Sequence, residues 1–322
     1  MSQDDLIPKP TSDLFTAVLW SAPKNEPILR SFINAVLTDV GMTPIVQATV
    51  LNPFNIKEFA ANKAIILDVR VEDEHGRLYD IEVQVAIHAA FVNRVLHYWS
   101  DVYASQLKAG HDYGELKPVI SIILTEFPIF PQLKNLHNVF QITAKEDPTV
   151  LLTPHFQIHF VRLSELLKGH REKLRNVQRE LQHWVNFFVF AAVKTEDEMS
   201  SLVDNDPIIQ KAYEELQRFY ANDELREKVR ERQQFLIDYH LGMNAAKQEG
   251  REEGREEGRE EGREEGCAKT IVAFLEARFD LVPESISDAV RTINDLEVLN
   301  HLTKIAAKCE SLAEFENALK KP

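Results

Sequence analysis

Residues 64–87 read AIILDVRVEDEHGRLYDIEVQVAI, and this stretch decides the fold. It holds two runs rich in Ile and Val, at 64–71 and 79–87, with charged residues and a glycine between them. Apolar and polar side chains alternate along both runs, as they do in a strand with one apolar and one polar face. The stretch predicts a β-hairpin.

The turn of this hairpin decides which residues face each other. A three-residue loop that ends at Gly76 would place the glycine where such a loop requires a positive φ. That loop pairs Arg70 with Asp80, two side chains of opposite charge. The same register places Asp68 opposite Glu82.

Asp68 and Glu82 are the pair on this face that points to chemistry. Two carboxylates on directly opposite residues repel each other and destabilise a hairpin. A bound divalent cation removes the conflict, and one or two carboxylates with waters form the kind of site that Mg²⁺ uses beside a phosphate. Gln84, two residues further along the same face, would then position a water or a phosphate oxygen. Periodicity alone does not favour a metal site. It favours a hairpin whose polar face is exposed to solvent.

The segments around the hairpin predict a mixed α/β domain followed by a helical second half. Helical spacing of apolar residues precedes the hairpin, and runs rich in Ile and Val lie before and after it. From residue 164 onward β-branched residues become rarer and helical spacing dominates. We expect helices at 13–20, 26–37 and 88–108, and strands at 45–51, 64–71, 79–87, 118–127 and 156–163.

A repeated segment interrupts the helical second half. Residues 250–266 contain the sequence Arg-Glu-Glu-Gly four times. Glu and Arg three residues apart on a helix attract by about 0.2–0.5 kcal/mol, whereas each glycine costs about 1 kcal/mol relative to alanine. These magnitudes favour a fraying helix or a flexible spacer, and self-association along the glycines is the alternative. Beyond the repeat, we expect short helices at 268–279, 286–293 and 296–307.

These segments define four expected regions. A sheet domain occupies residues 1–168, and a helical extension follows at 169–248. The repeat fills residues 249–266 as a linker or a helix. A small helical module forms residues 267–322.

The charge of the chain neither supports nor excludes a nucleic-acid partner. The formal net charge is −14, whereas phosphate binding normally draws on clustered Lys and Arg. Residues 1–168 hold 19 acidic and 14 basic side chains, a net charge of −5, so the remaining −9 lies in the second half. A local basic groove in the first half is compatible with these counts.

Other features bear on compartment and cofactors. The longest apolar run, 184–193, is far shorter than the roughly 20 residues of a membrane helix, so we expect no membrane span. The N-terminus lacks the pattern of a secretory signal, and the two cysteines suit a reducing compartment, so we expect the cytoplasm. Without a glycine-rich phosphate loop, no nucleotide cofactor is expected. His155 and His159 lack the partners of a zinc site.

The hairpin residues resemble the signature of the PD-(D/E)XK nuclease superfamily, which is an Asp on one strand and Glu-x-Lys on the next. More narrowly, the chain is similar to the Rpn family of recombination-promoting nucleases and transposases, in which Gln commonly ends the signature. The similarity covers residues 11–168, and Arg-Glu-Glu-Gly tracts often follow this domain in relatives. The matching segments include Asp13-Leu14-Phe15, Asn52-Pro53, Ile81-Glu82-Val83-Gln84, Phe91-Val92-Asn93-Arg94 with Tyr98, and Lys117-Pro118-Val119-Ile120.

The resemblance implies a restriction-endonuclease-like fold and a Mg²⁺-dependent DNA endonuclease that promotes recombination, with Mn²⁺ as a substitute ion. Asp68 and Glu82 would be the metal ligands, and Gln84 would be the third catalytic residue, in the place of the usual lysine. Because Gln offers dipoles where Lys offers a charge, this departure predicts slow or strongly metal-dependent turnover.

Three further residues are candidates for supporting roles. Glu26 is either a supporting acid from a helix or a solvated residue near a helix start. Lys63 belongs to the same matching stretch as Asp68. Arg94 contacts either a phosphate or an acid within the domain. The alternative function is a catalytically weak or inactive nuclease fold that acts as an oligomeric interaction module through its helical C-terminal half.

Overall fold

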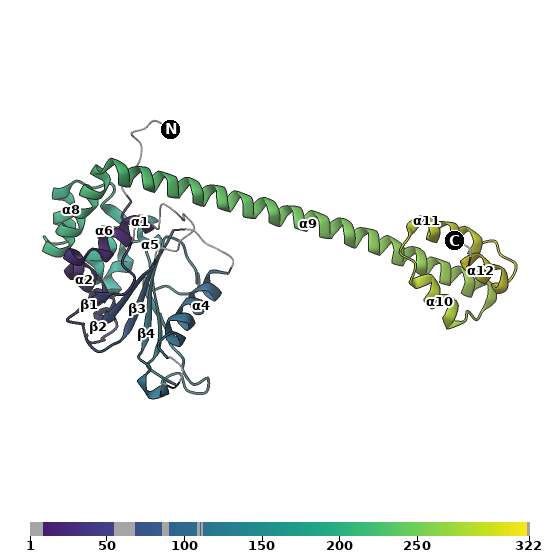
Figure 1. Cartoon of the computed structure of the whole chain (residues 1–322), viewed down its shortest axis with the longest axis horizontal. Coiled ribbons are helices and arrows are strands. Elements are labelled where there is room, and N and C mark those ends of the chain that lie inside the picture. The colour runs from purple at the N-terminus through teal and green to yellow at the C-terminus, as the bar shows by residue number, and fades with distance from the viewer. Residues whose placement is uncertain (1–8, 55–67, 86–89, 108–109, 111, 321–322) are drawn as a thin grey trace. The chain divides into compact units, whose positions relative to one another are not determined.

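The computed structural model describes residues 9–54, 68–85, 90–107, 110 and 112–320. The chain forms two compact units, Met1–Gln234 and Phe235–Pro322, and each is described by itself. The first unit contains a six-stranded mixed sheet with helices on both faces (Figure 1). This arrangement, followed by a helical C-terminal stretch, confirms the predicted fold class.

The sheet is antiparallel at its edges and parallel in the centre. Its strands are β1 (Ala48–Val50), β2 (Val69–Asp73), β3 (Leu78–Gln84), β4 (Val119–Thr125), β5 (His137–Phe140) and β6 (Phe156–Arg162). They lie in the order β1-β2-β3-β4-β6-β5, with β3, β4 and β6 parallel. Strand β4 reads VISIILT and is buried along its whole length, because helices cover both of its faces.

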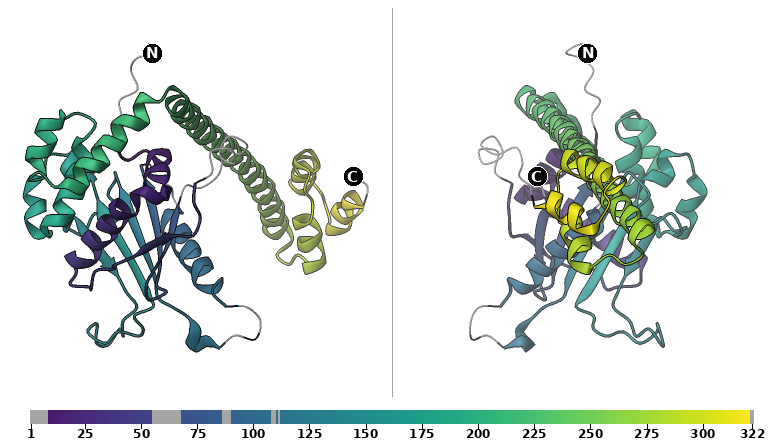
Figure 2. Two further views of the ribbon diagram at one scale, coloured as in Figure 1. Left: turned by 60° about the vertical axis from the view of Figure 1, so that its left-hand side comes forward. Right: turned by 90° about the vertical axis from the view of Figure 1, so that its right-hand side faces the viewer.

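The helices of the first unit lie in two layers. Helix α4 covers one face, and α1, α2, α6 and α8 cover the other; the views of Figure 2 agree. The helices are α1 (Asp13–Ser21), α2 (Glu26–Asp39), α4 (Phe91–Ala104), α5 (Ser164–Leu167), α6 (Arg179–Phe190), α7 (Glu196–Leu202) and α8 (Pro207–Ala221), with 3₁₀ turns η1 (Pro23–Asn25), η2 (Tyr113–Glu115) and η3 (Arg171–Asn176).

The main core joins the sheet to α6 and α8 as well as to α1 and α2. Phe32 stacks on Trp20 with ring centroids 5.0 Å apart, and it contacts Trp184 and Phe188 edge-on at 5.5 and 5.8 Å. Trp184 and Phe188 belong to α6, beyond the expected boundary at residue 168. The helices after the sheet therefore share one core with it, and the compact unit extends to Gln234.

The second unit is a small helical core at the end of a long helix. Helix α9 (Asp223–Phe279) includes the Arg-Glu-Glu-Gly repeat, and α10 (Glu284–Arg291), α11 (Leu296–Ala306) and α12 (Leu312–Leu319) follow. Ile271, Leu275, Leu299 and Phe315 are fully buried in this core. The structure thus places the repeat in a helix, which is one of the two conformations expected from the sequence.

Candidate metal centre

The hairpin of β2 and β3 has the predicted register. Arg70 pairs with Asp80, the Asp73 amide donates to the Arg77 carbonyl at 3.1 Å, and Gly76 has φ of 76°. All three observations confirm the three-residue loop.

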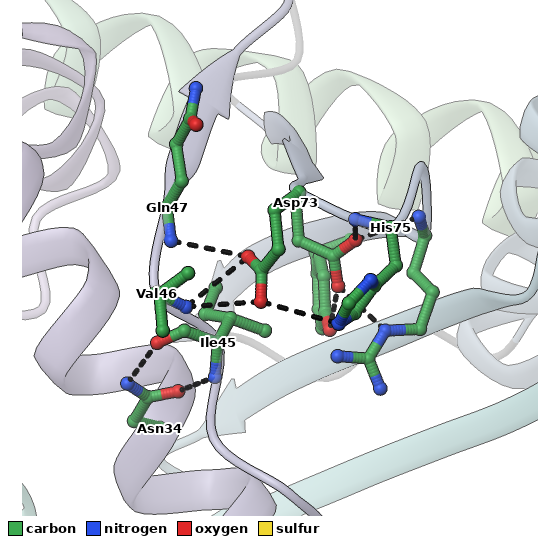
Figure 3. Close-up of polar contacts among 9 residues, drawn as sticks. Asn34, Ile45, Val46, Gln47, Asp73 and His75 are labelled. Atoms are coloured by element: carbon green, nitrogen blue, oxygen red, sulfur yellow. Dashed lines mark hydrogen bonds and ion pairs between the residues drawn. The ribbon is translucent and has the colours of Figure 1, made fainter.

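Acidic side chains at the turn hold this register. The Asp73 carboxylate accepts hydrogen bonds from the His75 amide at 2.8 Å, the Arg77 Nε at 2.6 Å and the Tyr79 hydroxyl at 2.9 Å (Figure 3). Burial alone would raise the pKa of Asp73, but these bonds, led by Arg77, hold the pKa below its ordinary value. The next residue, Glu74, accepts from two amides just before β1. The turn is therefore tied to both the hairpin and its neighbouring strand.

Asn52 fixes the other end of β2, where Asp68 lies. Its side-chain oxygen accepts from the Arg70 amide at 2.7 Å, and its side-chain nitrogen donates to the Asp68 carbonyl at 3.2 Å. These two bonds replace the strand partner that β1 no longer provides, because β1 ends at Val50. The Asp68 carboxylate is also held, since Arg70 Nε donates to its Oδ2 at 3.1 Å and the guanidinium approaches Asp101 at 3.7 Å.

Three carboxylates gather on this face of the hairpin: Asp68, Asp80 and Glu82. Burial, followed by the negative charges of Asp68 and Glu82, raises the pKa of Asp80 to about 7. Burial also raises the pKa of Glu82; the Arg94 charge opposes that shift and the Asp68 charge adds to it. The Oδ1 atom of Asp80 is buried and has no hydrogen-bond partner among the described residues. The three acids thus form an electrostatically strained cluster.

Arg94, from the second turn of α4, reaches this cluster from above the sheet face. Its Nη2 donates to Glu82 Oε1 at 2.8 Å and to Gln84 Oε1 at 2.6 Å. The guanidinium carbon lies 5.3 Å from the centre of the Phe91 ring and 6.0 Å from that of Tyr98, which are distances of cation–π contact. Helix α4 therefore brings a cation to the end of β3.

Glu26 and Lys63 are the two other candidates from the sequence. Glu26 pairs with Arg30 at 2.9 Å and accepts from the Ala48 amide at 3.1 Å, and Ala48 faces Asp73 at the turn end of β2. Glu26 therefore lies at the turn end of β2, whereas Asp68 lies at the other end, and a supporting role for Glu26 stays a prediction. Lys63 lies outside the described residues.

Two residues that the sequence analysis did not select belong to the site, Asp80 and Asn52. Asp80 carries the same alternation signal as Glu82 and Gln84, and the predicted register pairs it with Arg70, a side chain of opposite charge. The structure instead buries Asp80 and leaves Arg70 bonded to Asp68. Asn52-Pro53 is one of the segments that resemble the family, but the two hydrogen bonds of Asn52 to Arg70 and Asp68 depend on tertiary contacts.

The acids fit a hard divalent cation held in part by water or substrate. No three Asp, Glu, His or Cys side chains converge as a ready-made metal cage in the part of the chain that the structure describes. Mg²⁺ commonly keeps several waters and uses one or two carboxylates together with substrate phosphates. Asp68 and Glu82 supply that number, and the unpartnered oxygen of Asp80 lies in the same cluster.

A mixed sheet flanked by helices, with acidic side chains on a hairpin, is the arrangement of PD-(D/E)XK nucleases. The chain belongs to a transposase family within this class, because the family model described as PD-(D/E)XK nuclease family transposase matches residues 10–246. The match confirms the resemblance seen in the sequence and extends it to the helices that share the core of the sheet.

Comparison of the chain with curated proteins and with solved structures identifies no further relative. No curated protein and no solved structure matches the chain. Among the described residues, no helix combines the length and the apolar character that crossing a membrane requires.

Proposed function

We propose that this chain is a Mg²⁺-dependent DNA endonuclease that hydrolyses phosphodiester bonds and thereby promotes DNA recombination. The observation that carries the proposal is the crowding of Asp68 and Glu82 on one face of the hairpin, in a chain of a PD-(D/E)XK nuclease family. Like charges at close range are costly in a buried site unless a cation is bound, so the cluster is suited to a divalent ion.

Asp68 and Glu82 would hold the ion, and Mn²⁺ would serve as a substitute. A bound divalent ion would supply an activated water and stabilise charge that develops on the phosphate. The side chains around it position these ligands. Arg70 holds the Asp68 carboxylate, and Asn52 holds the backbone on which it sits. Gln84 lies two residues past Glu82 on the same strand face and is the third member of the proposed site.

A DNA substrate is consistent with the acidic composition if binding is local. Among the described residues, Arg70 and Arg94 lie near the acids, and each already pairs with a carboxylate. Because these two arginines are already paired, we expect weak DNA binding in the absence of a divalent ion and strong dependence on the concentration of that ion.

Nicking of supercoiled plasmid in Mg²⁺ or Mn²⁺ tests the proposal. Wild type should nick, and Asp68→Ala and Glu82→Ala should reduce the rate by about 100-fold or more, as expected when a group that stabilises transition-state charge is lost. The matched control is Asp197→Ala, because Asp197 is an exposed acid on α7. Equal rates for wild type and Asp68→Ala would refute the proposal.

Metal binding provides a readout that does not depend on turnover. Saturable Mn²⁺ binding, followed by calorimetry, should weaken in Glu82→Gln and persist in Asp197→Ala. If wild type and Glu82→Gln bound Mn²⁺ with equal affinity, Glu82 would not be a metal ligand, even if DNA were still cut.

A second candidate function is an oligomeric interaction module. The observation that favours it is a group of large apolar side chains exposed on α9: Ile237 at 53%, Tyr239 at 54%, Leu241 at 63% and Met243 at 56%. Ile237 and Leu241 are four residues apart and share one face of the helix, whereas Tyr239 and Met243 share the opposite face. Exposed apolar side chains that share a face are suited to an association surface. The Arg and Glu side chains of the following repeat carry both charges, so a second copy of α9 would be a complementary partner.

Mass in solution tests this candidate. Light scattering at micromolar concentration should show an oligomer for the full chain, and Ile237→Glu with Leu241→Glu should shift it to monomer. Gln233→Glu, at an exposed polar position of the same helix, is the control. A monomeric wild type would eliminate this function, and an oligomer without nicking activity would favour it over the nuclease.

A further inference from the structure

With glutamine at position 84, the proposed site has one positive charge fewer than a site that has lysine there. The family signature ends in lysine in many nucleases, whereas this chain has Gln84, whose amide carries no net charge. A cation near the scissile phosphate stabilises the charge that develops during hydrolysis, and an amide dipole does so less strongly. Another positively charged side chain beside residue 84 would supply this stabilisation in place of the lysine.

Arg94 lies where such a cation is needed. One guanidinium nitrogen, Nη2, contacts both Glu82 and Gln84, the second and third residues of the signature. A guanidinium can only donate, so Gln84 must present its carbonyl oxygen to it. The 2.6 Å contact therefore fixes the orientation of the Gln84 amide as well as the position of Arg94.

Aromatic contacts hold the guanidinium further in place. Phe91 precedes Arg94 by one turn of α4 and Tyr98 follows it by one turn, and both rings lie within cation–π distance. The arginine is thus held by two acceptors on β3 and two rings on its own helix. A pre-positioned cation of this kind loses little conformational freedom when an anion binds.

Arg94 still has donors to offer a ligand. Its side chain is 29% exposed, so it is not sealed inside the protein. Its Nε is buried and has no acceptor among the described residues. Both bonds to β3 use Nη2 alone, out of five N–H groups on a guanidinium. Buried donors normally have acceptors, so an orphan donor beside an acidic metal-type site points to an absent anionic partner.

We propose that Arg94 contacts the scissile phosphate and replaces the signature lysine, and that Gln84 is the positioning residue that holds Arg94. This assignment rests on the proposed nuclease function and deepens it, because it names the group that binds the phosphate. It also gives a reason for a glutamine at position 84: a lysine there would repel the guanidinium, whereas the amide oxygen attracts it.

The experiment combines substitutions at positions 94 and 84 in the full chain. Single-turnover cleavage in Mg²⁺ and the affinity for short duplex DNA without divalent ions, across a salt series, are measured for each variant. The variants are Arg94→Ala, Arg94→Lys, Gln84→Leu, Gln84→Lys, and Arg94→Ala combined with each change at 84. The matched control is Arg218→Ala, because Arg218 on α8 also binds two acceptors, at 2.9 and 2.6 Å, far along the chain from the hairpin.

Arg94→Ala should slow cleavage by about 100-fold or more and lower the slope of log affinity against log salt by about one. Arg94→Lys should keep the salt slope but recover only part of the rate, because it keeps the charge and loses the planar fork. Arg218→Ala should leave both unchanged.

The double variants separate direct from indirect action. In the Gln84→Lys background, Arg94→Ala should cost less than about tenfold, because the introduced ammonium supplies the charge. Gln84→Leu should slow wild type but add little to Arg94→Ala, because the glutamine acts through the arginine. Additive losses in this pair would overturn the positioning role of Gln84.

Three results would overturn the assignment of Arg94. If wild type nicks DNA through Asp68 and Arg94→Ala nicks equally fast, Arg94 is not needed and the proposed function stands. If Arg94→Ala binds Mn²⁺ more tightly and cleaves at least as fast, the arginine is a counter-ion that the metal displaces. If wild type does not cleave, the catalytic role fails together with the proposed function.

Discussion

His159 is fully buried in β6, in a chain of polar side chains that is separate from the candidate metal centre. Its Nε2 lies 3.2 Å from Gln157 Oε1, its Nδ1 lies 3.0 Å from His137 Nε2, and His137 Nδ1 lies 2.6 Å from Asp39 Oδ2. The Asp39 carboxylate also accepts from the Gln178 amide just before α6. The chain therefore links β6, β5, the end of α2 and the start of α6.

Burial, followed by the neighbouring His137, lowers the pKa of His159 from 6.5 to about 3. The unfolded chain therefore binds a proton at this site between pH 6.5 and 3 that the folded chain does not bind. Stability should fall as pH falls through this window, by at most about 1.4 kcal/mol per pH unit for one proton. Urea unfolding of His159→Gln at pH 7, 6, 5 and 4 should show a shallower dependence than wild type.

The control for this measurement is His97→Gln, because His97 is exposed on α4. Its pH dependence should match that of wild type. All three tryptophans, Trp20, Trp99 and Trp184, lie in the first compact unit, so tryptophan fluorescence follows the unit that contains His159. A slope that His159→Gln leaves unchanged would mean that acid instability comes from carboxylates instead.

At the scale of elements, the hairpin was predictable because its signals are local. Alternation marked both strands, and Gly76 fixed the loop length and so the pairing of Arg70 with Asp80. Strand β5 was missed because its four residues, HNVF, carry little alternation and form an edge strand. Helix α12 was missed as well, because it is a short terminal helix of eight residues whose burial depends on the second core.

The candidate site was only partly predictable, for reasons of tertiary structure. Strand periodicity places Asp68, Glu82 and Gln84 on one face, and the family resemblance implies their roles. The contact of Arg94 with β3, in contrast, depends on how α4 packs over the sheet. Glu26 was selected by analogy, and its position depends on α2, which places it beside β1. Neither arrangement has a periodic signal in the sequence.

Asn52 allows a test of how the edge of β2 supports Asp68. Asn52→Ala removes two hydrogen bonds across the backbone, so we expect a loss of about 1–3 kcal/mol in the free energy of unfolding. Because the bonds hold Arg70 and Asp68, Mn²⁺ affinity should also fall. Unfolding in urea and calorimetric Mn²⁺ titration measure the two effects.

Asn34 is a matched control, because its side chain also makes two hydrogen bonds to backbone groups, those of Ile45. Asn34 accepts from the Ile45 amide at 2.7 Å and donates to the Ile45 carbonyl at 2.9 Å. Figure 3 shows both bonds as dashed lines. Asn34→Ala should cost a similar stability and leave Mn²⁺ affinity unchanged. If both variants, or neither, lost Mn²⁺ affinity, Asn52 would have no special role in positioning Asp68.

At the scale of the whole molecule, two compact units that bury separate sets of hydrophobic residues predict two unfolding transitions. Phe315 is fully buried in the second core, so Phe315→Ala should destabilise that unit by about 3–5 kcal/mol. Circular dichroism should report earlier loss of helix in this variant. Tryptophan fluorescence should be unchanged, because every tryptophan lies in the first unit.

The reciprocal variant is Phe32→Ala, at the centre of the aromatic cluster with Trp20 and Trp184. It should lower the midpoint of the fluorescence transition and leave the second core intact. If Phe315→Ala lowered the fluorescence midpoint as well, the units would unfold as one. In that case, continuity of α9 would couple a change in the small helical core to the stability of the sheet that carries Asp68 and Glu82.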